Sequence, residues 1–263
     1  MSQNYSEITQ DHNDGLERSR ISYRWSRLFI LPAWVFISVF TAQLIIIGVI
    51  WVIKYLHIPI ESLNQTVLNT TLSAILYILT LTIVITIPWL IKSRRTSKQD
   101  IGLTRLPTWT DILLAPGGFI TYLILSSLLI LLATTVLPGF DINQVQDTGF
   151  SHLNQNYELI LAFITLVVVA PIAEEVLFRG YLYGKLKKFV PVWVAIIVTS
   201  LSFGVIHGAW NLAIDTFALS LILCTLREIT GNIWASILLH MIKNGVAFYI
   251  LFISPSLLTT LVR

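Results

Sequence analysis

The stretch from Pro171 to Gly180 reads PIAEEVLFRG and places two glutamates and an arginine directly after an uncharged apolar run. Glu175 and Arg179 are four residues apart, so in a helix they share one face and can form an ion pair. Glu174 is rotated by about 100° from Glu175 and has no such local partner. An unpaired, partly buried carboxylate is a candidate general base. The alternative is that all three charges form a buried ion cluster that holds helices together.

Two histidines follow on later apolar runs. Phe203 lies four residues before His207 in SFGVIHGAWN, and His240 lies four residues before Asn244 in LLHMIKNG. A single intramembrane histidine is more often explained by a hydrogen bond between helices. Two of them on separate runs, beside an unpaired glutamate, favour a hydrolytic site. Such a site needs a base, a second group that contacts the water, and donors for an oxyanion.

Three other polar residues in the apolar runs are interpreted as structural. Asp215 is expected at the end of a run, and Lys243 either lines a cavity or extends towards the cytosol. Cys224 is the one cysteine of the chain, so neither a disulfide framework nor a cysteine-based metal site is expected. None of these residues is included in the predicted site.

The composition indicates that the candidate residues lie in a membrane protein. Of the 263 residues, 55% are hydrophobic and 12% are charged, whereas soluble domains have about 25% charged residues. A helix needs about 20 apolar residues to cross a bilayer. The sequence therefore predicts an all-α, polytopic transmembrane helix bundle of about seven spans, within a range of six to eight. The predicted spans are 28–53, 68–91, 112–137, 157–184, 191–207, 211–226 and 233–253. The fifth and sixth are short enough to be re-entrant instead.

The basic residues predict the orientation, because cytoplasmic loops are enriched in Lys and Arg. If the spans alternate, 13 of the 17 Lys and Arg fall on one side of the membrane. These are Arg18, Arg20, Arg24, Arg27, Lys92, Arg94, Arg95, Lys98, Arg105, Lys185, Lys187, Lys188 and Arg227. The loop 138–158 on the other side has no basic residue. The amino terminus is therefore predicted to be cytoplasmic, with Ser97 inside the cell and Gln146 outside.

The chain is expected to divide into four parts. Residues 1–27 form a polar cytoplasmic tail without the layout of a signal peptide. Residues 28–104 contain the first two spans and a basic cytoplasmic loop, and no motif is found in these spans. Residues 105–253 form the core that holds the candidate site. Residues 254–263 are too short to cross the membrane and are expected to lie at its interface.

The three motifs together resemble those of a known family. They read Glu-Glu-x-x-x-Arg at 174–179, Phe-x-x-x-His at 203–207 and His-x-x-x-Asn at 240–244. In this order on successive spans they are similar to the motifs of the CAAX-protease and bacteriocin-processing (CPBP) intramembrane endopeptidases, also called the Abi family. Each motif alone has low specificity, whereas all three within about 70 residues have high specificity. The resemblance covers about residues 105–250.

The resemblance implies a role for each motif residue. The implied catalytic residues are Glu174 and His207, which activate the attacking water, and His240 and Asn244, which stabilise the oxyanion. The implied supporting and orienting residues are Glu175, Arg179 and Phe203. A glutamate and two histidines can also bind zinc, so Glu174, His207 and His240 are alternative zinc ligands. The chain has no His-Glu-x-x-His helix, and the metal-free, glutamate-dependent form without a cofactor is preferred.

The implied activity is hydrolysis of a peptide or protein substrate near the membrane surface. In a bacterium the protein would act in bacteriocin or signal-peptide maturation or in self-immunity, and in a eukaryote on prenylated carboxy-terminal peptides. The alternatives are a catalytically silent immunity or binding protein of the same fold and, less favoured, a proton-coupled transporter, whose usual inverted repeats are not found. The expected location is the cell membrane as a multi-pass protein, or the endoplasmic reticulum membrane in a eukaryote. The expected partners are the substrate and the lipid bilayer, and no nucleic acid.

Overall fold

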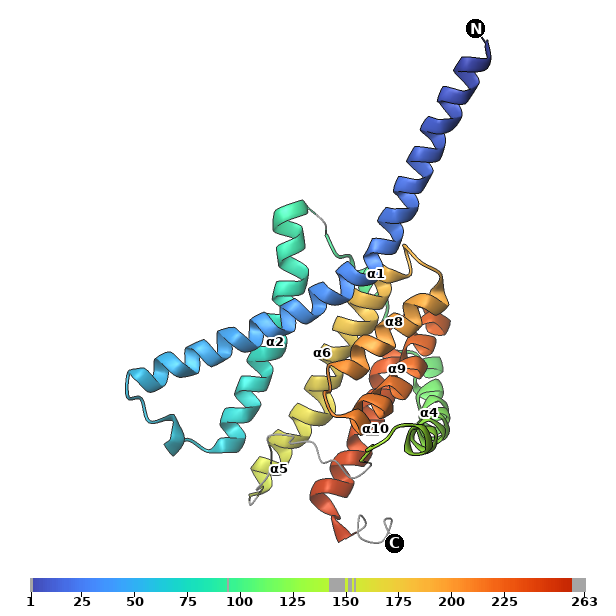
Figure 1. The fold of residues 1–263 in the computed structure, drawn as a ribbon. Coiled ribbons are helices and arrows are strands. Elements are labelled where there is room, and N and C mark those ends of the chain that lie inside the picture. The colour runs from blue at the N-terminus through green and yellow to red at the C-terminus, as the bar shows by residue number, and fades with distance from the viewer. Residues whose placement is uncertain (1, 94, 142–149, 151–152, 154, 257–263) are drawn as a thin grey trace.

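The computed structural model of the chain describes residues 2–93, 95–141, 150, 153 and 155–256 (Figure 1). The regular elements of these residues are all helices, so the all-α prediction is confirmed. Gln146, which was predicted to lie outside the cell, and the tail from residue 257 onward are outside the described residues.

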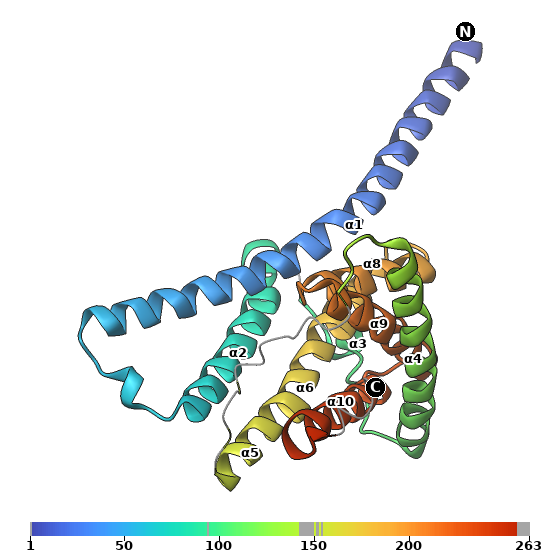
Figure 2. The ribbon, with the colours of Figure 1, turned by 60° about the horizontal axis from the view of Figure 1, so that its bottom comes forward.

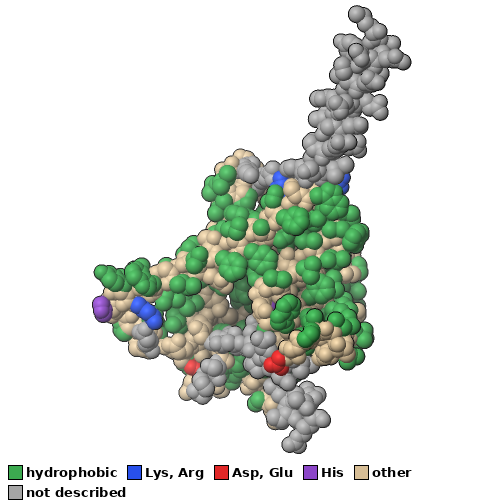
Figure 3. All heavy atoms as spheres, viewed as in Figure 1, with side chains coloured by type: hydrophobic (Ala, Val, Ile, Leu, Met, Phe, Trp, Pro, Cys, Tyr) green, Lys and Arg blue, Asp and Glu red, His purple; other side chains and the backbone are tan. Residues whose placement is uncertain are grey.

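Within the described part of the chain, 5 helical segments are long and apolar enough to cross a membrane. They are Arg24–Tyr55, Gln65–Ile91, Trp109–Val136, Asn156–Leu186 and Trp234–Ile253. Hydrophobic side chains cover most of the face shown in Figure 3, as expected for a surface in lipid. The protein is therefore a multi-pass membrane protein. The fifth and sixth predicted spans form α8 (Val192–Val205) and α9 (Trp210–Thr230), which are not among the five, so the count of seven stays a prediction.

The first two long helices form a hairpin that projects from the side of the bundle (Figures 1 and 2). Helix α1 (Ser2–Tyr55) continues without interruption across the predicted boundary at residue 27, contains Pro32 and bends where it passes the bundle. The short helix η1 (Ile60–Ser62) leads into α2 (Gln65–Lys92). The Trp34 indole donates a hydrogen bond of 3.3 Å to the Val84 carbonyl and joins the two helices.

The fourth predicted span is one helical path of α and π turns. Its parts are α5 (Asn156–Phe163), the π-helix η2 (Ile164–Val169), α6 (Ala170–Glu175), the π-helix η3 (Val176–Tyr183) and α7 (Gly184–Leu186). Pro171 near the start of α6 lacks a backbone N–H and its ring crowds the preceding turn, and the wider turns of η2 relieve this conflict. Both glutamates of the first motif therefore lie on a short α-helix between two π-helices.

Four further helices pack around this path and form the core. They are α4 (Trp109–Val136), α8, α9 and α10 (Trp234–Phe248), and α10 continues as the π-helix η4 (Tyr249–Ile253). Helices α8 and α9 approach closely at Gly204, where a Cβ would lie 2.7 Å from the Ala213 carbonyl oxygen. A larger residue at position 204 would therefore push the two helices apart.

The basic segments come together at one end of the molecule. Arg24 Nε donates to the Phe189 carbonyl at 3.0 Å, and Lys188 contacts Asp100 of α3 (Lys98–Ile101). These contacts join the middle of α1, the segment after α2 and the end of the central path. The predicted segregation of Lys and Arg to one side agrees with this arrangement. Which face of the membrane this end occupies stays a prediction.

Candidate active site

Glu175 is the centre of a buried charge network. Its Oε1 accepts hydrogen bonds from Arg179 Nη1 at 2.9 Å and from His240 Nδ1 at 2.8 Å. The side chains of Glu175 and Arg179 are fully buried. The predicted ion pair four residues apart is therefore present, and it extends across to α10. Because a carboxylate oxygen can only accept, His240 Nδ1 carries the proton in this hydrogen bond.

Glu174 differs from its neighbour in both exposure and partners. Its side chain is 20% exposed, and Oε1 accepts a hydrogen bond of 2.9 Å from the Tyr77 hydroxyl. The other oxygen, Oε2, lies 3.8 Å from His240 Nε2, which is longer than a hydrogen bond. Glu174 thus has no partner on its own helix, as predicted, but it has one from α2.

Tyr77 is a site residue that the sequence did not predict. It lies in the middle of α2, in a span without any motif of the family. A phenolic hydroxyl within an apolar helix requires a polar partner. This requirement is the one feature of the sequence that could have indicated a role for Tyr77. The identity of the partner depends on how α2 packs against α6, which the sequence does not specify.

The sequence predicted His207 as the last residue of a span from 191 to 207. In the structure it lies two residues beyond the end of α8. Helix α8 ends at Val205, and the chain turns through Gly208, whose φ of +78° is readily adopted by glycine, before α9 begins. His207 Nδ1 is 2.7 Å from the Phe203 carbonyl oxygen. Because this oxygen only accepts, Nδ1 carries the proton and Nε2 presents a lone pair in the neutral ring.

Phe203 joins the two histidines and the arginine. Its fully buried ring lies with its centroid 4.8 Å from that of His207 and 5.9 Å from that of His240. Arg179 Cζ lies 4.3 Å from the same centroid, in the range of a cation–π interaction. Phe178 packs edge-on against Phe203 at 4.9 Å. The second motif is therefore in contact with both of the others.

Asn244 connects α10 to the π-helix η2. Its Nδ2 donates a hydrogen bond of 2.9 Å to the Leu166 carbonyl. This bond fixes which end of the amide faces η2 and uses one of the two amide hydrogens. The second amide hydrogen is left for another acceptor.

Whether this site can hold a metal ion depends on how its possible ligand side chains are placed. Among the described residues, no group of three or more His, Cys, Asp or Glu side chains is arranged to hold a metal ion. The alternative zinc ligands, Glu174, His207 and His240, thus do not form a ligand set in this arrangement. No catalytic step is therefore derived through a metal.

A second charged cluster lies between α4, α9 and α10. The Tyr122 hydroxyl and Ser126 Oγ both donate to Asp215 Oδ1 at 2.6 Å, and Lys243 Nζ lies 3.6 Å from Asp215 Oδ2. Asp215 and Lys243 were both placed outside the site from the sequence. In the structure these two side chains form an ion pair with each other.

Residues 156–246 match the family model described as type II CAAX prenyl endopeptidase Rce1-like. All three motifs lie within this segment, from Glu174 to Asn244. The family recognised from the motifs is thereby confirmed for this segment, and it is a family of membrane endopeptidases.

Two curated proteins are similar to part of the chain. An uncharacterised protein of Escherichia coli is 29% identical over 89 residues, which are 32% of this chain and 41% of that protein. A Bacillus subtilis protein named "Putative membrane peptidase YdiL" is 27% identical over 104 residues, which are 36% of this chain and 43% of that protein. The chain thus spans less than half the length of either relative. No solved structure matches the chain.

Proposed function

We propose that the protein is an intramembrane endopeptidase that hydrolyses a peptide bond of a peptide or protein substrate near the membrane surface. The observation that carries this proposal is the convergence of Glu174 Oε2 and His240 Nε2 at 3.8 Å, within the segment matched to membrane endopeptidases. Two polar atoms at this separation can both contact one oxygen atom at hydrogen-bond distances of about 2.8 Å. A water or a substrate oxygen fits this description.

In the proposed first step, Glu174 takes a proton from the attacking water. The Tyr77 hydroxyl holds the other carboxylate oxygen and limits rotation of the side chain. His207 Nε2 accepts a hydrogen bond from the second hydrogen, which stays on the attacking oxygen, because Nδ1 of this ring already donates to the Phe203 carbonyl. This division of roles is supported by the tautomer that the Phe203 carbonyl imposes.

His240 and Asn244 are proposed to stabilise the oxyanion that forms when water attacks. Because Glu175 holds the proton on His240 Nδ1, His240 Nε2 can donate only when the ring is positively charged. Asn244 would donate through the amide hydrogen that the Leu166 carbonyl does not use. Donors of this kind act on charge that exists only after attack, so they accelerate the reaction itself.

Glu175 and Arg179 are proposed as positioning residues. Glu175 fixes the orientation of the His240 ring, and Arg179 balances the buried charge of Glu175. A carboxylate behind a functional histidine fixes the proton position and the orientation of the ring in many sites. The same arrangement explains why the first motif contains two adjacent glutamates, one of which faces His240 Nδ1 and the other Nε2.

We propose that the reaction needs no cofactor and that the substrate reaches the site from the membrane. Two substrate classes fit this proposal. One is a prenylated carboxy-terminal peptide, the class named by the family description. The other is a bacteriocin or signal-peptide precursor, whose cleavage would serve maturation or self-immunity.

The proposal is tested by profiling peptide termini in membranes from cells that produce the wild-type protein or Glu174→Gln. New termini in membrane-associated substrates are expected with the wild type and not with Glu174→Gln. Glu228→Gln is the matched control, because this carboxylate pairs with Lys187 away from the site, and it should give the wild-type termini. Identical termini for wild type and Glu174→Gln at equal abundance would favour the catalytically silent immunity or binding protein.

A further inference from the structure

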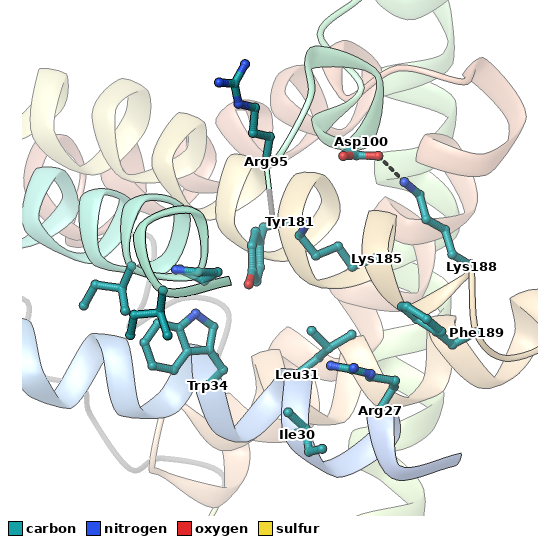
Figure 4. Close-up of a pocket in the computed structure, with 13 residues that line it drawn as sticks. Arg27, Ile30, Leu31, Trp34, Arg95, Asp100, Tyr181, Lys185, Lys188 and Phe189 are labelled. Carbon is teal, nitrogen blue, oxygen red and sulfur yellow. Dashed lines mark hydrogen bonds and ion pairs between the residues drawn. The ribbon is translucent and has the colours of Figure 1, made fainter. Parts of the chain in front are cut away.

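A cavity of about 630 Å³ lies between α1, α2 and the end of the central path, and none of its lining residues belongs to the candidate active site (Figure 4). Its lining includes four cations, Arg27, Arg95, Lys185 and Lys188, and one carboxylate, Asp100. They come from the middle of α1, from the segment between α2 and α4, and from α7 and the residues that follow it. Three parts of the chain that are distant in sequence thus give this cavity an excess of positive charge.

The one carboxylate is engaged by the protein itself. Asp100 contacts Lys188 and also accepts from the backbone N–H of Ser97 at 2.9 Å, as part of the capping box of α3. The carboxylate is thus already paired with Lys188, whereas the lining as a whole contains four cations and one carboxylate. An anionic ligand can bind to a lining with such an excess of positive charge.

The other walls of the cavity are apolar. Leu31 and Trp34 of α1 face Tyr181 and Phe189 across it. Trp34 is held in place by its hydrogen bond to the Val84 carbonyl. A small soluble anion would leave this apolar surface without a partner, whereas a ligand with a hydrocarbon chain would cover it.

The cavity is open towards the lipid-facing surface of α1 and α2. Ile30 of α1 and Ile91 of α2 contribute to its lining, and they are 50% and 72% exposed. Both helices belong to segments that are long and apolar enough to span a membrane. A lipid molecule can therefore enter sideways with its chain along the helices.

We propose that this cavity is a binding site for an anionic phospholipid. The phosphate would contact Arg95 and Lys185, and an acyl chain would lie along Leu31 and Trp34. Basic pockets between transmembrane helices bind anionic headgroups in this way. The lipid would join the α1–α2 hairpin, outside the matched segment 156–246, to the central path inside it. The site does not depend on peptidase activity, so the two proposals can fail separately.

The test is native mass spectrometry of the full-length protein in detergent with added phosphatidylglycerol, phosphatidylcholine of the same acyl chains, or inorganic phosphate. One phosphatidylglycerol per chain is expected, together with a higher melting temperature, and neither phosphatidylcholine nor phosphate should have this effect. The variant Arg95→Gln/Lys185→Gln should bind phosphatidylglycerol roughly 30-fold more weakly, since each cation near the membrane surface strengthens binding by roughly fivefold. Lys98→Gln, an exposed cation on α3 outside the lining, should bind like the wild type.

A second variant leaves the charges in place. Ile30→Trp fills the apolar part of the cavity and should also weaken phosphatidylglycerol binding, with normal folding verified by size-exclusion chromatography. Equal binding of phosphatidylcholine, full binding by the double variant, or an equal stabilisation by inorganic phosphate would overturn the proposal. Recovery of a peptide instead of a lipid from this cavity would overturn it as well.

Discussion

Two clusters of charged side chains lie within the helices, and each has at its centre a carboxylate bound to a tyrosine of another helix. Asp215 Oδ1 accepts from both Tyr122 and Ser126, and its Oδ2 lies 3.6 Å from the Lys243 ammonium. Glu174 Oε1 accepts from Tyr77, and its Oε2 lies 3.8 Å from His240 Nε2. Both carboxylate side chains are 20% exposed, so exposure does not separate the two clusters.

The two clusters differ in the groups that contact each carboxylate. Asp215 is bounded by two hydroxyl donors and a cation, so its negative charge is compensated within the cluster. Glu174 has one hydroxyl donor, and its second oxygen faces an imidazole whose other nitrogen is already held by Glu175. A charge within the membrane is costly and is often functional. Both carboxylates lie within helical segments, so location alone does not identify a candidate catalyst. The difference is that one oxygen of Glu174 has no hydrogen-bond donor or lysine close to it among the described residues, whereas both oxygens of Asp215 have such a partner.

The largest effect is expected from the fully buried Glu175. Glu175→Gln leaves the Arg179 charge buried without a counter-charge and removes the anionic acceptor of His240 Nδ1. Breaking a buried ion pair costs about 3–5 kcal/mol, so the melting temperature in detergent and the cellular abundance should both fall. The partly exposed pair of Glu228 and Lys187 provides the control, because Glu228→Gln should lower both much less than Glu175→Gln does. A normal melting temperature for Glu175→Gln would show that the network is not structural.

Asn244→Ala is expected to have the next largest effect, on turnover. Loss of one oxyanion donor lowers the rate by about 100- to 1,000-fold, and KM should change little because the oxyanion exists only after attack. The adjacent Lys243→Gln belongs to the other cluster and should leave kcat within a few fold of the wild type. Steady-state kinetics on a substrate found by terminus profiling measures both. A change in KM alone for Asn244→Ala would assign this amide to substrate binding instead.

A matched pair of tyrosine variants compares the clusters directly. Tyr77→Phe removes the hydroxyl that holds Glu174, and Tyr122→Phe removes one that holds Asp215. Tyr77→Phe should lower kcat by about tenfold, the equivalent of one hydrogen bond to a charged group. Tyr122→Phe should instead lower stability by about 1–3 kcal/mol with kcat nearly unchanged. The opposite pattern would exchange the roles of the two clusters.

The smallest effect is expected from a carboxylate outside the membrane-spanning segments. Partial burial works to raise the pKa of Asp100, but hydrogen bonds from Lys188 and Ser97 outweigh it and hold this pKa below its ordinary value of 3.8. The stabilisation is therefore present above pH 3.8 and is lost as the pH falls through the lowered pKa. Asp100→Asn should cost less than about 1 kcal/mol at neutral pH. The difference in melting temperature from the wild type should shrink towards acid pH, and a growing difference would contradict this sign.

The sequence predicted the helices well and the contacts between them less well. Apolar length predicted the long helices, and spacing of four residues predicted the Glu175–Arg179 pair, because both are properties of a single helix. Tyr77 was missed because its partner Glu174 lies 97 residues away. The contact of Asn244 with the Leu166 carbonyl was missed because it depends on the π-helix η2. Composition carries little information about a π turn, which forms where tertiary packing and Pro171 widen the helix.

The position of His207 illustrates the same limit. Apolar continuity extended the predicted span to residue 207, whereas α8 ends at Val205. The sequence contained the signal in Gly208, which takes a positive φ in the turn. Phe203 and His207 are nevertheless four residues apart in contact, as the motif implied. The contact between the two residues is kept although the helix ends between them, because the His207 ring bonds to the Phe203 carbonyl four residues earlier.

The distinction between Glu174 and Asp215 is tested most directly by single-turnover cleavage with purified, exhaustively chelated wild type, Glu174→Gln and Asp215→Asn. Metal content is measured by elemental analysis on the same samples. The wild type should stay active with substoichiometric zinc, Glu174→Gln should lose roughly 100- to 10,000-fold in rate, as expected for a general base, and Asp215→Asn should keep its rate within about tenfold. A Glu174→Gln variant that cleaves at the wild-type rate, or one zinc per chain that is lost and regained together with activity, would contradict the proposed roles.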